Sequence, residues 1–523
     1  MAIILWTRER VASEILAGAY LIIYNDLLLR IPTKWLEQHP GGALCIQHFV
    51  GRDAADEIES YHPDHVLELV RRYQVGTVSL PWKPLVPPVM SGWVRTSSNA
   101  WHKEAEAIRS TSNTQILLVQ KRPGAAYIPT HETLEPGYSN LSAEDQAQHS
   151  AAYKVLHKRV RDAGLYDTRY LSGYGPDVLR YALLASLSVY AYCNAWFLTS
   201  AVFLGLLWQQ LSFISHDLGH VGVTHDWNID RLLGILIADW IGGVSISWWV
   251  DDHNVHHLVP NHPSHDPTIE HLPFLAISPV FFNSLWSTHY RRTLHFDRFA
   301  KFFIQIQHRL FYIVLALARV NLYASSYPFL ARKAFDTKRA RGGRWAWWLE
   351  VVGIIVFWYW YGRVLANCGS FKAGLAYLLI SHVAASPVHV QIVLSHFSMS
   401  TADLGPSESF PHRQLRTTTD VHCADSLGWI HGGLQLQVTH HLFPRLPRHN
   451  LKAASLLVKE FAAEQGLVYA EFGWINGQKD VLGVLRSVAD QVRIIATVAD
   501  GEARDVAESL RKLGLGVMEE KKA

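Results

Sequence analysis

Three clusters of histidines provide the clearest chemical signal in this chain of 523 residues. They read His216-Asp-Leu-Gly-His220, His253-Asn-Val-His256-His257 and Gln437-Val-Thr-His440-His441. Residues three and four apart share one face of a helix, so each cluster directs its imidazoles to one side. If the clusters converge, they bring together seven imidazoles, more than the four ligands of one zinc ion. The set suits two metal ions that accept nitrogen ligands and keep positions open, and iron is the natural candidate.

A second pair of histidines lies near the N-terminus. In His39-Pro-Gly-Gly42 the proline fixes the approach of the chain, and the glycines let the backbone come close to a flat cofactor. His62 follows a short helix that we expect between Asp53 and Tyr61. Two histidines on opposing elements can bind a haem iron from both faces, which suits electron transfer rather than oxygen binding. His65 is an alternative to His62 as the second ligand.

The composition indicates a membrane protein. Apolar residues make up 49 % of the chain and charged residues 18 %, below the ~25 % typical of soluble domains. The net charge of +3 gives no indication of a nucleic-acid partner. The cysteines lack Cys-x-x-Cys spacing, which argues against a disulfide framework, a zinc finger and an iron–sulfur cluster. They are Cys45, Cys193, Cys368 and Cys423.

Apolar segments are expected to place the clusters at the membrane. From Tyr181 to Ser215 no charged residue appears over 35 residues, which as one helix would be ~52 Å long against a hydrocarbon core of ~30 Å. We therefore predict two spans, near 181–197 and 198–215, joined by a turn near Asn194. The third cluster meets the first two only if an even number of spans separates them, and 346–366 and 373–396 are the candidates.

Of two further apolar segments, 231–250 is predicted to be buried or interfacial, and 310–329 to lie along the membrane rather than through it. The residues from Arg332 to Arg344 form a basic loop after the segment 310–329. Its positive charge indicates that this loop faces the cytosol, and the histidine clusters are expected on the same side. His382, His389 and His396 recur every seven residues on nearly one helix face. The alternatives for these three are hydrogen bonds to neighbouring helices and the lining of a substrate tunnel. His396 is also a candidate metal ligand, because it is closest to the cytosolic end.

These signals divide the chain into four parts: a compact module (1–78), a linker with amphipathic pre-membrane helices (79–174), a membrane domain (175–465) and a C-terminal cytosolic tail (466–523). In the second part we expect helices over 99–120 and 143–164. In the tail, 492–498 is a strand candidate, and the role of the tail is not predicted.

Residues from about 10 to 78 resemble a cytochrome b5 domain. The matching segments are Leu21-Ile-Ile-Tyr24, Trp35-Leu-Glu-Gln-His39-Pro-Gly-Gly, Gly51-Arg-Asp53-Ala and His62. The resemblance implies an N-terminal α+β domain that binds haem b, with His39 and His62 as axial ligands. The chain departs from the pattern at Ala55, where threonine is commoner.

Residues 175 to 465 resemble the membrane fatty-acid desaturases. This resemblance implies an all-α membrane domain with four transmembrane helices and a cytosolic helical cap that holds two non-haem iron ions. The implied ligands are His216, His220, His253, His256, His257, His440 and His441, with Gln437 and His396 as further candidates. Glutamine at position 437, combined with a fused cytochrome b5 domain, is typical of the front-end desaturases. The implied location is the endoplasmic reticulum membrane, with the haem domain and the histidines facing the cytosol.

Five segments are similar to fungal sphingolipid 8-desaturases, namely Ser215–His225, Trp248-Trp249, Asp252–His257, His265–Pro273 and Pro387–Thr401. The similarity implies insertion of a double bond at the 8 position of the long-chain base of ceramide, with O2 as cosubstrate. Electrons would come from an NADH-cytochrome b5 reductase through the fused domain. A front-end acyl-lipid desaturase and a lipid hydroxylase with the same di-iron site remain alternatives. His225, His265 and His271 are expected to make supporting hydrogen bonds rather than to bind metal.

Overall fold

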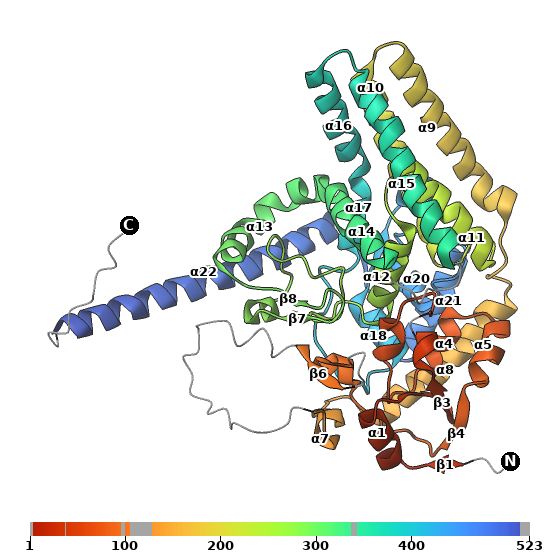
Figure 1. The fold of residues 1–523 in the computed structure, drawn as a ribbon, viewed down its shortest axis with the longest axis vertical. Coiled ribbons are helices and arrows are strands. Elements are labelled where there is room, and N and C mark those ends of the chain that lie inside the picture. Colours follow the sequence, from red (N-terminus) through yellow and green to blue (C-terminus); the bar gives the residue numbers. More distant parts are fainter. Residues whose placement is uncertain (1–3, 37, 96–99, 105–127, 336–342, 513–523) are drawn as a thin grey trace.

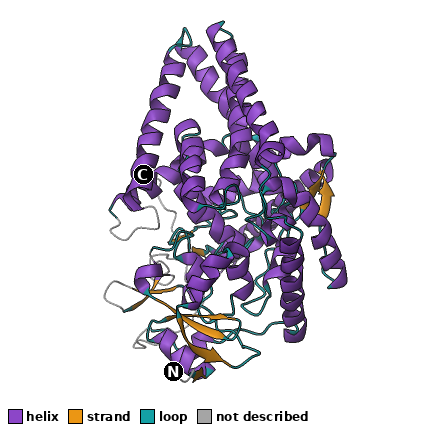
Figure 2. Ribbon diagram, turned by 90° about the vertical axis from the view of Figure 1, so that its right-hand side faces the viewer, coloured by secondary structure: helices purple, strands orange, loops and turns teal. Residues whose placement is uncertain are grey.

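The computed structural model describes residues 1–523 except 1–3, 37, 96–99, 105–127, 336–342 and 513–523. Helices α9 (Gly175–Cys193), α10 (Phe197–Gly219) and α16 (Phe371–Ala385) extend together from one end of the molecule (Figure 1). The N-terminal strands lie at the opposite end, and most of the remaining chain is helical (Figure 2). The long helix α22 (Trp474–Lys512) projects to one side.

The N-terminal module, which comprises residues 4–78, is built on a sheet with the strand order β1-β4-β3-β2. Strands β2 and β3 pair antiparallel from Tyr20↔Ile31 to Tyr24↔Leu27, while β1 and β4 run parallel. Buried apolar residues of both sheet faces form its core, as the predicted strand at Leu21–Tyr24 requires. Its strands are β1 (Leu5–Trp6), β2 (Tyr20–Tyr24), β3 (Leu27–Ile31) and β4 (Gln74–Val78). Its helices are α1 (Arg8–Leu16), α2 (Thr33–Leu36), α3 (Leu44–Gln47), α4 (Ala55–Tyr61) and α5 (Asp64–Arg71).

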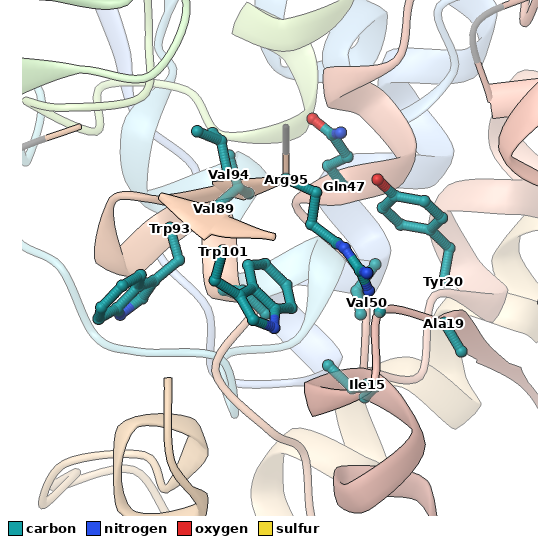
Figure 3. Close-up of a pocket in the computed structure, with 12 residues that line it drawn as sticks. Ile15, Ala19, Tyr20, Gln47, Val50, Val89, Trp93, Val94, Arg95 and Trp101 are labelled. Atoms are coloured by element: carbon teal, nitrogen blue, oxygen red, sulfur yellow. The ribbon is translucent and has the colours of Figure 1, made fainter. Parts of the chain in front are cut away.

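A short hairpin in the linker packs on the N-terminal module beside a small pocket (Figure 3). Strand β5 (Trp93–Arg95) follows the 3-10 helix η1 (Pro88–Ser91) and pairs antiparallel with β6 (Trp101–Lys103). The Trp101 indole N–H donates to the Leu16 carbonyl over 2.7 Å, and the Arg95 guanidinium donates to the Ala17 carbonyl over 2.6 Å. These bonds attach the linker to the end of α1.

The helix predicted over 99–120 is wrong where the structure describes it. Residues Trp101–Lys103 form β6, and residues 105–127 lie outside the described residues. The cross-strand partners explain the difference. Lys103 pairs with Trp93 and places its ammonium 5.2 Å from the indole ring, and Arg95 makes the same contact with Trp101. Such cross-strand pairs stabilise a strand against helix propensity.

Helix α8 (Ala143–Asp162) confirms the predicted amphipathic helix. Its buried residues Tyr153, Leu156 and Val160 enter a core that also contains Phe443. The Tyr153 hydroxyl donates to the Leu442 carbonyl over 2.7 Å, so α8 supports the segment that carries the third histidine cluster. A short helix, α7 (His131–Leu134), precedes it.

The turn predicted near Asn194 is present between α9 and α10, while the prediction that both helices span the membrane stays a prediction. Among the described residues, three segments are long and apolar enough to cross a membrane: Phe197–Gly219, Arg344–Ala366 and Phe371–Leu394. Two bent helix pairs would raise this to as many as five spans. The predicted number of four is therefore not established, and α9, which contains the first predicted span, is not among the three. The second and third candidates correspond to α15 (Gly343–Ala366) and to α16 with α17 (Pro387–Leu394).

Each of the two apolar segments that were not predicted to span the membrane, 231–250 and 310–329, contains a sharp break. Helix α11 (Trp227–Gly234) continues as the π-helix η4 (Ile235–Ile241) and meets α12 (Ile246–Leu258) at 112°. Helices α13 (Arg298–Ala316) and α14 (Ala318–Ala334) meet at 69°. The Ser245 hydroxyl caps α12 by accepting from the Trp248 amide.

The strand predicted at 492–498 is wrong, because α22 runs through it. Val481, Leu485, Val488 and Val492 are buried at helical spacing and pack in one core with residues of α13, so a period of three to four residues outweighs the local β-branched run. The π-helix η3 (Tyr170–Tyr174) precedes α9, and the other remaining elements lie between α12 and α22. They are η5 (Pro279–Asn283), β7 (Trp286–Ser287), β8 (Arg292–Thr293), α18 (Phe410–Thr417), β9 (Asp420–His422), η6 (Asp425–Leu427), α19 (Gly428–His431), α20 (Gln437–Leu442), η7 (Arg448–Asn450), α21 (Leu451–Glu464) and β10 (Glu471–Gly473).

Candidate metal and haem sites

The three histidine clusters converge in the structure and divide into two groups. The first cluster lies at the end of α10, the second on α12 and the third on α20. The ligand atoms within each group all lie within 4.8 Å of one another. The five-histidine group consists of His216, His220, His253, His257 and His440, and the three-histidine group consists of His256, His396 and His441.

In the five-histidine group the Nε2 atoms face each other. His253 Nε2 lies 3.3 Å from that of His216 and 3.0 Å from that of His257, which lies 3.1 Å from that of His440. The buried Nε2 of His220 has no hydrogen-bonding partner among the described residues. Burial holds the pKa of His440 well below its usual range, so this imidazole is neutral and can act as a metal ligand. Converging nitrogen lone pairs of this kind suit a bound cation.

In the three-histidine group each Nδ1 has a partner that orients its ring. His441 Nδ1 lies 3.0 Å from the Gln414 side-chain oxygen and His396 Nδ1 lies 3.2 Å from the Thr417 carbonyl. His256 Nδ1 lies 2.9 Å from an oxygen of Asp266 and 2.8 Å from the Thr268 hydroxyl. An Nδ1–H that donates to such an acceptor leaves Nε2 as the metal-binding atom. The Nε2 of His441 is indeed buried without a partner in the described part of the chain.

Two of these orienting residues were not identified from the sequence. Asp266 lies in the His265-Asp-Pro segment, where its position near a histidine cluster is the available signal. Gln414 lies on α18, far from every cluster in sequence, and no local pattern marks it. Its amide nitrogen also donates to the His257 carbonyl over 2.8 Å, so one side chain contacts residues of both groups.

The other histidines considered above lie outside the two groups. The His225 ring lies 2.8 Å from the Tyr166 carbonyl, and His265 Nδ1 lies 3.1 Å from the Thr288 hydroxyl. His271 packs against Phe397, and His382 contacts the Leu378 carbonyl. His389 lies in α17, and Gln437 is buried in the first turn of α20.

His39 and His62 face each other in the N-terminal module, and His62 rather than His65 is the ring opposite His39. Their ring centres are 6.0 Å apart, and two imidazoles that share one metal ion, each ~2 Å from it, have centres roughly 6 Å apart. His39 Nδ1 lies 3.2 Å from the Gly42 carbonyl, and His62 Nδ1 lies 2.9 Å from the Ile58 carbonyl. Burial lowers the pKa of His62 to about 4. Both rings are thus held neutral with Nε2 available, and they fit the axial positions of a haem.

The N-terminal module contacts the rest of the chain through buried groups. Glu57 of α4 and Arg413 of α18 form an ion pair of 2.6 Å in which each side chain is only 8 % exposed. Phe49 lies 5.9 Å beneath the Arg413 guanidinium. A side chain in place of Gly42, whose φ is +89°, would reach to 2.6 Å from an oxygen of Asp251. The glycine expected to admit a cofactor thus also lets α12 approach the module.

Comparison with known proteins finds separate matches for the membrane domain and for the N-terminal module. The family model described as "Fatty acid desaturase" matches residues 194–473, and the one described as "Cytochrome b5-like Heme/Steroid binding domain" matches residues 7–79. The chain is similar to the Delta 8-(E)-sphingolipid desaturase of Emericella nidulans, at 40 % identity over 94 % of this chain and 95 % of the relative. It is 40 % identical to the protein of the same name from Komagataella phaffii, over 94 % of both chains. The Delta(8)-fatty-acid desaturase 2 of Arabidopsis thaliana is 30 % identical over 90 % of this chain and 91 % of the relative.

Proposed function

This chain belongs to the fatty acid desaturase family and carries an N-terminal cytochrome b5-like domain, and from that premise we propose that it inserts a double bond at the 8 position of the sphingoid base of ceramide. The convergence of eight histidines into two groups is the observation that carries the proposal. The substrate and position follow from the names of relatives that align along almost the entire chain. The identity to the fungal sphingolipid enzymes exceeds that to the plant relatives named as fatty-acid desaturases, which favours the long-chain base over an acyl chain.

The two histidine groups are the proposed sites of two non-haem iron ions. The five-histidine group would hold one ion, and the three-histidine group, which includes His396, would hold the other. Gln437 remains a further candidate ligand from the first turn of α20. His39 and His62 would bind haem b. When bound, the irons supply the O2-dependent oxidation that general acid–base residues cannot, because an unactivated methylene has no acidic proton, and the haem supplies single electrons.

The overall reaction balances with an external reductant. One O2, two electrons and two protons convert a –CH2–CH2– unit into –CH=CH– and two molecules of water. We propose an NADH-cytochrome b5 reductase as the electron donor. The contribution of the chain is to orient its imidazoles through Asp266, Gln414 and the Thr417 carbonyl, and to bury the site away from bulk water.

We further propose that the protein lies in the endoplasmic reticulum membrane with the N-terminal module and the histidine groups on the cytosolic side. The apolar helices α9, α10 and α16 extend away from the N-terminal module (Figure 1). Both redox sites therefore lie on one side of these helices, where a soluble reductase can reach the module.

Lipid analysis of a yeast that makes ceramides without 8-unsaturated bases tests the proposal. Expression of the chain should yield a long-chain base that is lighter by two hydrogens, with the double bond at position 8. The His256→Ala variant is the matched control and should give no product. A base that gains one oxygen would identify a hydroxylase, and unsaturation confined to the acyl chain would identify an acyl-lipid desaturase; either result would refute the proposal.

A further inference from the structure

One helix, α12, contacts both redox sites. Its three histidines enter the two metal-binding groups. On the side of the N-terminal module, Asp251 and Asn254 lie so close to Gly42 and Gly41 that a Cβ on either glycine would approach them to 2.6 and 3.3 Å. Leu258, the last residue of α12, packs in a core of the N-terminal module. The module is thus attached directly to the helix that carries the second histidine cluster.

Tyr61 links the candidate haem site to the metal-binding histidine groups. It is the last residue of α4 and directly precedes the haem-ligand candidate His62. Its ring centre lies 6.3 Å from that of His257, at an interplanar angle of 84° that is typical of an edge contact. His257 in turn stacks on His441 of the three-histidine group, with ring centres 4.0 Å apart. Tyr61 is bonded through the backbone to His62, and its ring leads through His257 and His441 to both metal groups.

The docked position of Tyr61 is held by its neighbours. Glu57 precedes Tyr61 by one helical turn on the same face of α4, and its buried partner Arg413 lies on α18. The next residue on α18, Gln414, donates to the His257 carbonyl and contacts His441. The ion pair therefore fixes α4 against the same helix that orients the His441 ring and binds the His257 backbone.

Hydrogen bonding by the Tyr61 hydroxyl does not explain why the Tyr61 ring lies against His257. Its oxygen is buried and has no hydrogen-bonding partner within the described ranges, and leaving a buried polar group unpaired is costly. The aromatic ring is what this residue contributes to the contact with His257.

We propose that Tyr61 is the bridging side chain through which electrons pass from the N-terminal module to His257 and the metal groups. The inference rests on the proposed function. Each passage oxidises one ferrous haem to the ferric state and adds one electron to the metal site, and two passages, with O2 and two protons, complete one desaturation. The ring is not itself consumed. Without the Tyr61 ring, electrons would have to cross a gap between the N-terminal module and His257. Electron tunnelling decays far more steeply across such a gap than through packed, bonded atoms.

The test uses the full-length, haem- and iron-loaded enzyme and three variants. In Tyr61→Leu the ring is lost, in Tyr61→Phe the ring is kept without the hydroxyl, and Tyr73→Leu removes a half-buried tyrosine elsewhere in the N-terminal module. The haem is reduced with NADH and reductase, and its reoxidation on mixing with O2 and ceramide is followed by stopped-flow absorbance. The haem spectrum, midpoint potential and iron content are measured in parallel.

We expect Tyr61→Leu to slow haem reoxidation by an order of magnitude with unchanged spectrum, potential and iron content, whereas Tyr61→Phe and Tyr73→Leu stay close to the parent rate. Reoxidation of Tyr61→Leu at the parent rate would overturn the inference. So would equal slowing in Tyr61→Phe, because the hydroxyl and not the ring would then be responsible. Failure of the proposed function looks different: the parent enzyme would reoxidise its haem without forming an 8-unsaturated base.

Discussion

The ion pair between Glu57 and Arg413 provides a quantitative test of how the N-terminal module docks. An exposed pair of this kind contributes about 0–1 kcal/mol, but both side chains here are 8 % exposed and 2.6 Å apart. Glu57→Gln removes one charge and leaves Arg413 buried without its counter-charge, which costs ~3–5 kcal/mol. Undocking relieves that cost because the guanidinium regains water. The docking equilibrium should therefore shift toward the undocked state on the order of 10²–10⁴-fold.

The assay is the rate at which the reduced haem is reoxidised in the presence of O2 and ceramide. We expect Glu57→Gln to slow this rate strongly while the haem spectrum and the non-haem iron content stay unchanged. The tether limits the loss, since a short linker keeps the module at an effective concentration of order mM. The double variant Glu57→Leu with Arg413→Met is the control, because apolar replacement of both partners of a buried pair is often neutral, and it should recover much of the rate. A parent-like rate in Glu57→Gln would show that the pair is not buried in the electron-transferring state and would refute this reasoning.

Three further predictions concern single side chains. Asp266→Asn weakens the acceptor on His256 and should lower iron affinity by ~10–100-fold without changing the haem spectrum, as metal analysis after dialysis against a chelator would reveal; full iron retention would speak against the orienting role. His62→Ala should abolish the haem spectrum and leave the non-haem iron in place, whereas a surviving spectrum would point to His65. Burial acts to raise the pKa of Glu408, but hydrogen bonds from its His and Arg partners prevail and lower it from 4.5 to about 2. Between pH 2 and 4.5 the unfolded chain therefore binds more protons at this group than the folded chain does. Glu408 should contribute ~3 kcal/mol to the free energy of unfolding above pH 4.5, and this contribution is lost as pH falls through 2. Unfolding curves of Glu408→Gln should lack that portion of the acid dependence, and curves identical to those of the parent would contradict the prediction.

The histidine spacing predicted which residues converge, but not how they divide. His256 and His257 are adjacent on α12 and enter different groups, because successive residues of a helix point ~100° apart. His396, a candidate because it is closest to the cytosolic end of the last apolar segment, lies in the three-histidine group. Its assignment as a ligand stays a prediction until metal is measured.

The docking of the N-terminal module could not be predicted, since it depends on contacts between residues that are hundreds of positions apart. Glu57 meets Arg413 across 356 residues, and nothing local to either residue marks the pair. The same holds for Gln414, whose importance comes only from the position of α18 beside the histidines. Local patterns also failed at 101–103 and 492–498, where cross-strand pairing and packing on α13 decided the outcome.

Metal analysis of the purified full-length protein, combined with its absorbance spectrum, tests the central claim most directly. Two histidine groups and one axial pair predict two non-haem irons and one haem iron per chain, with the spectrum of a haem bound by two histidines. Zinc in the histidine groups, or a single non-haem metal per chain, would contradict the proposed oxygen chemistry.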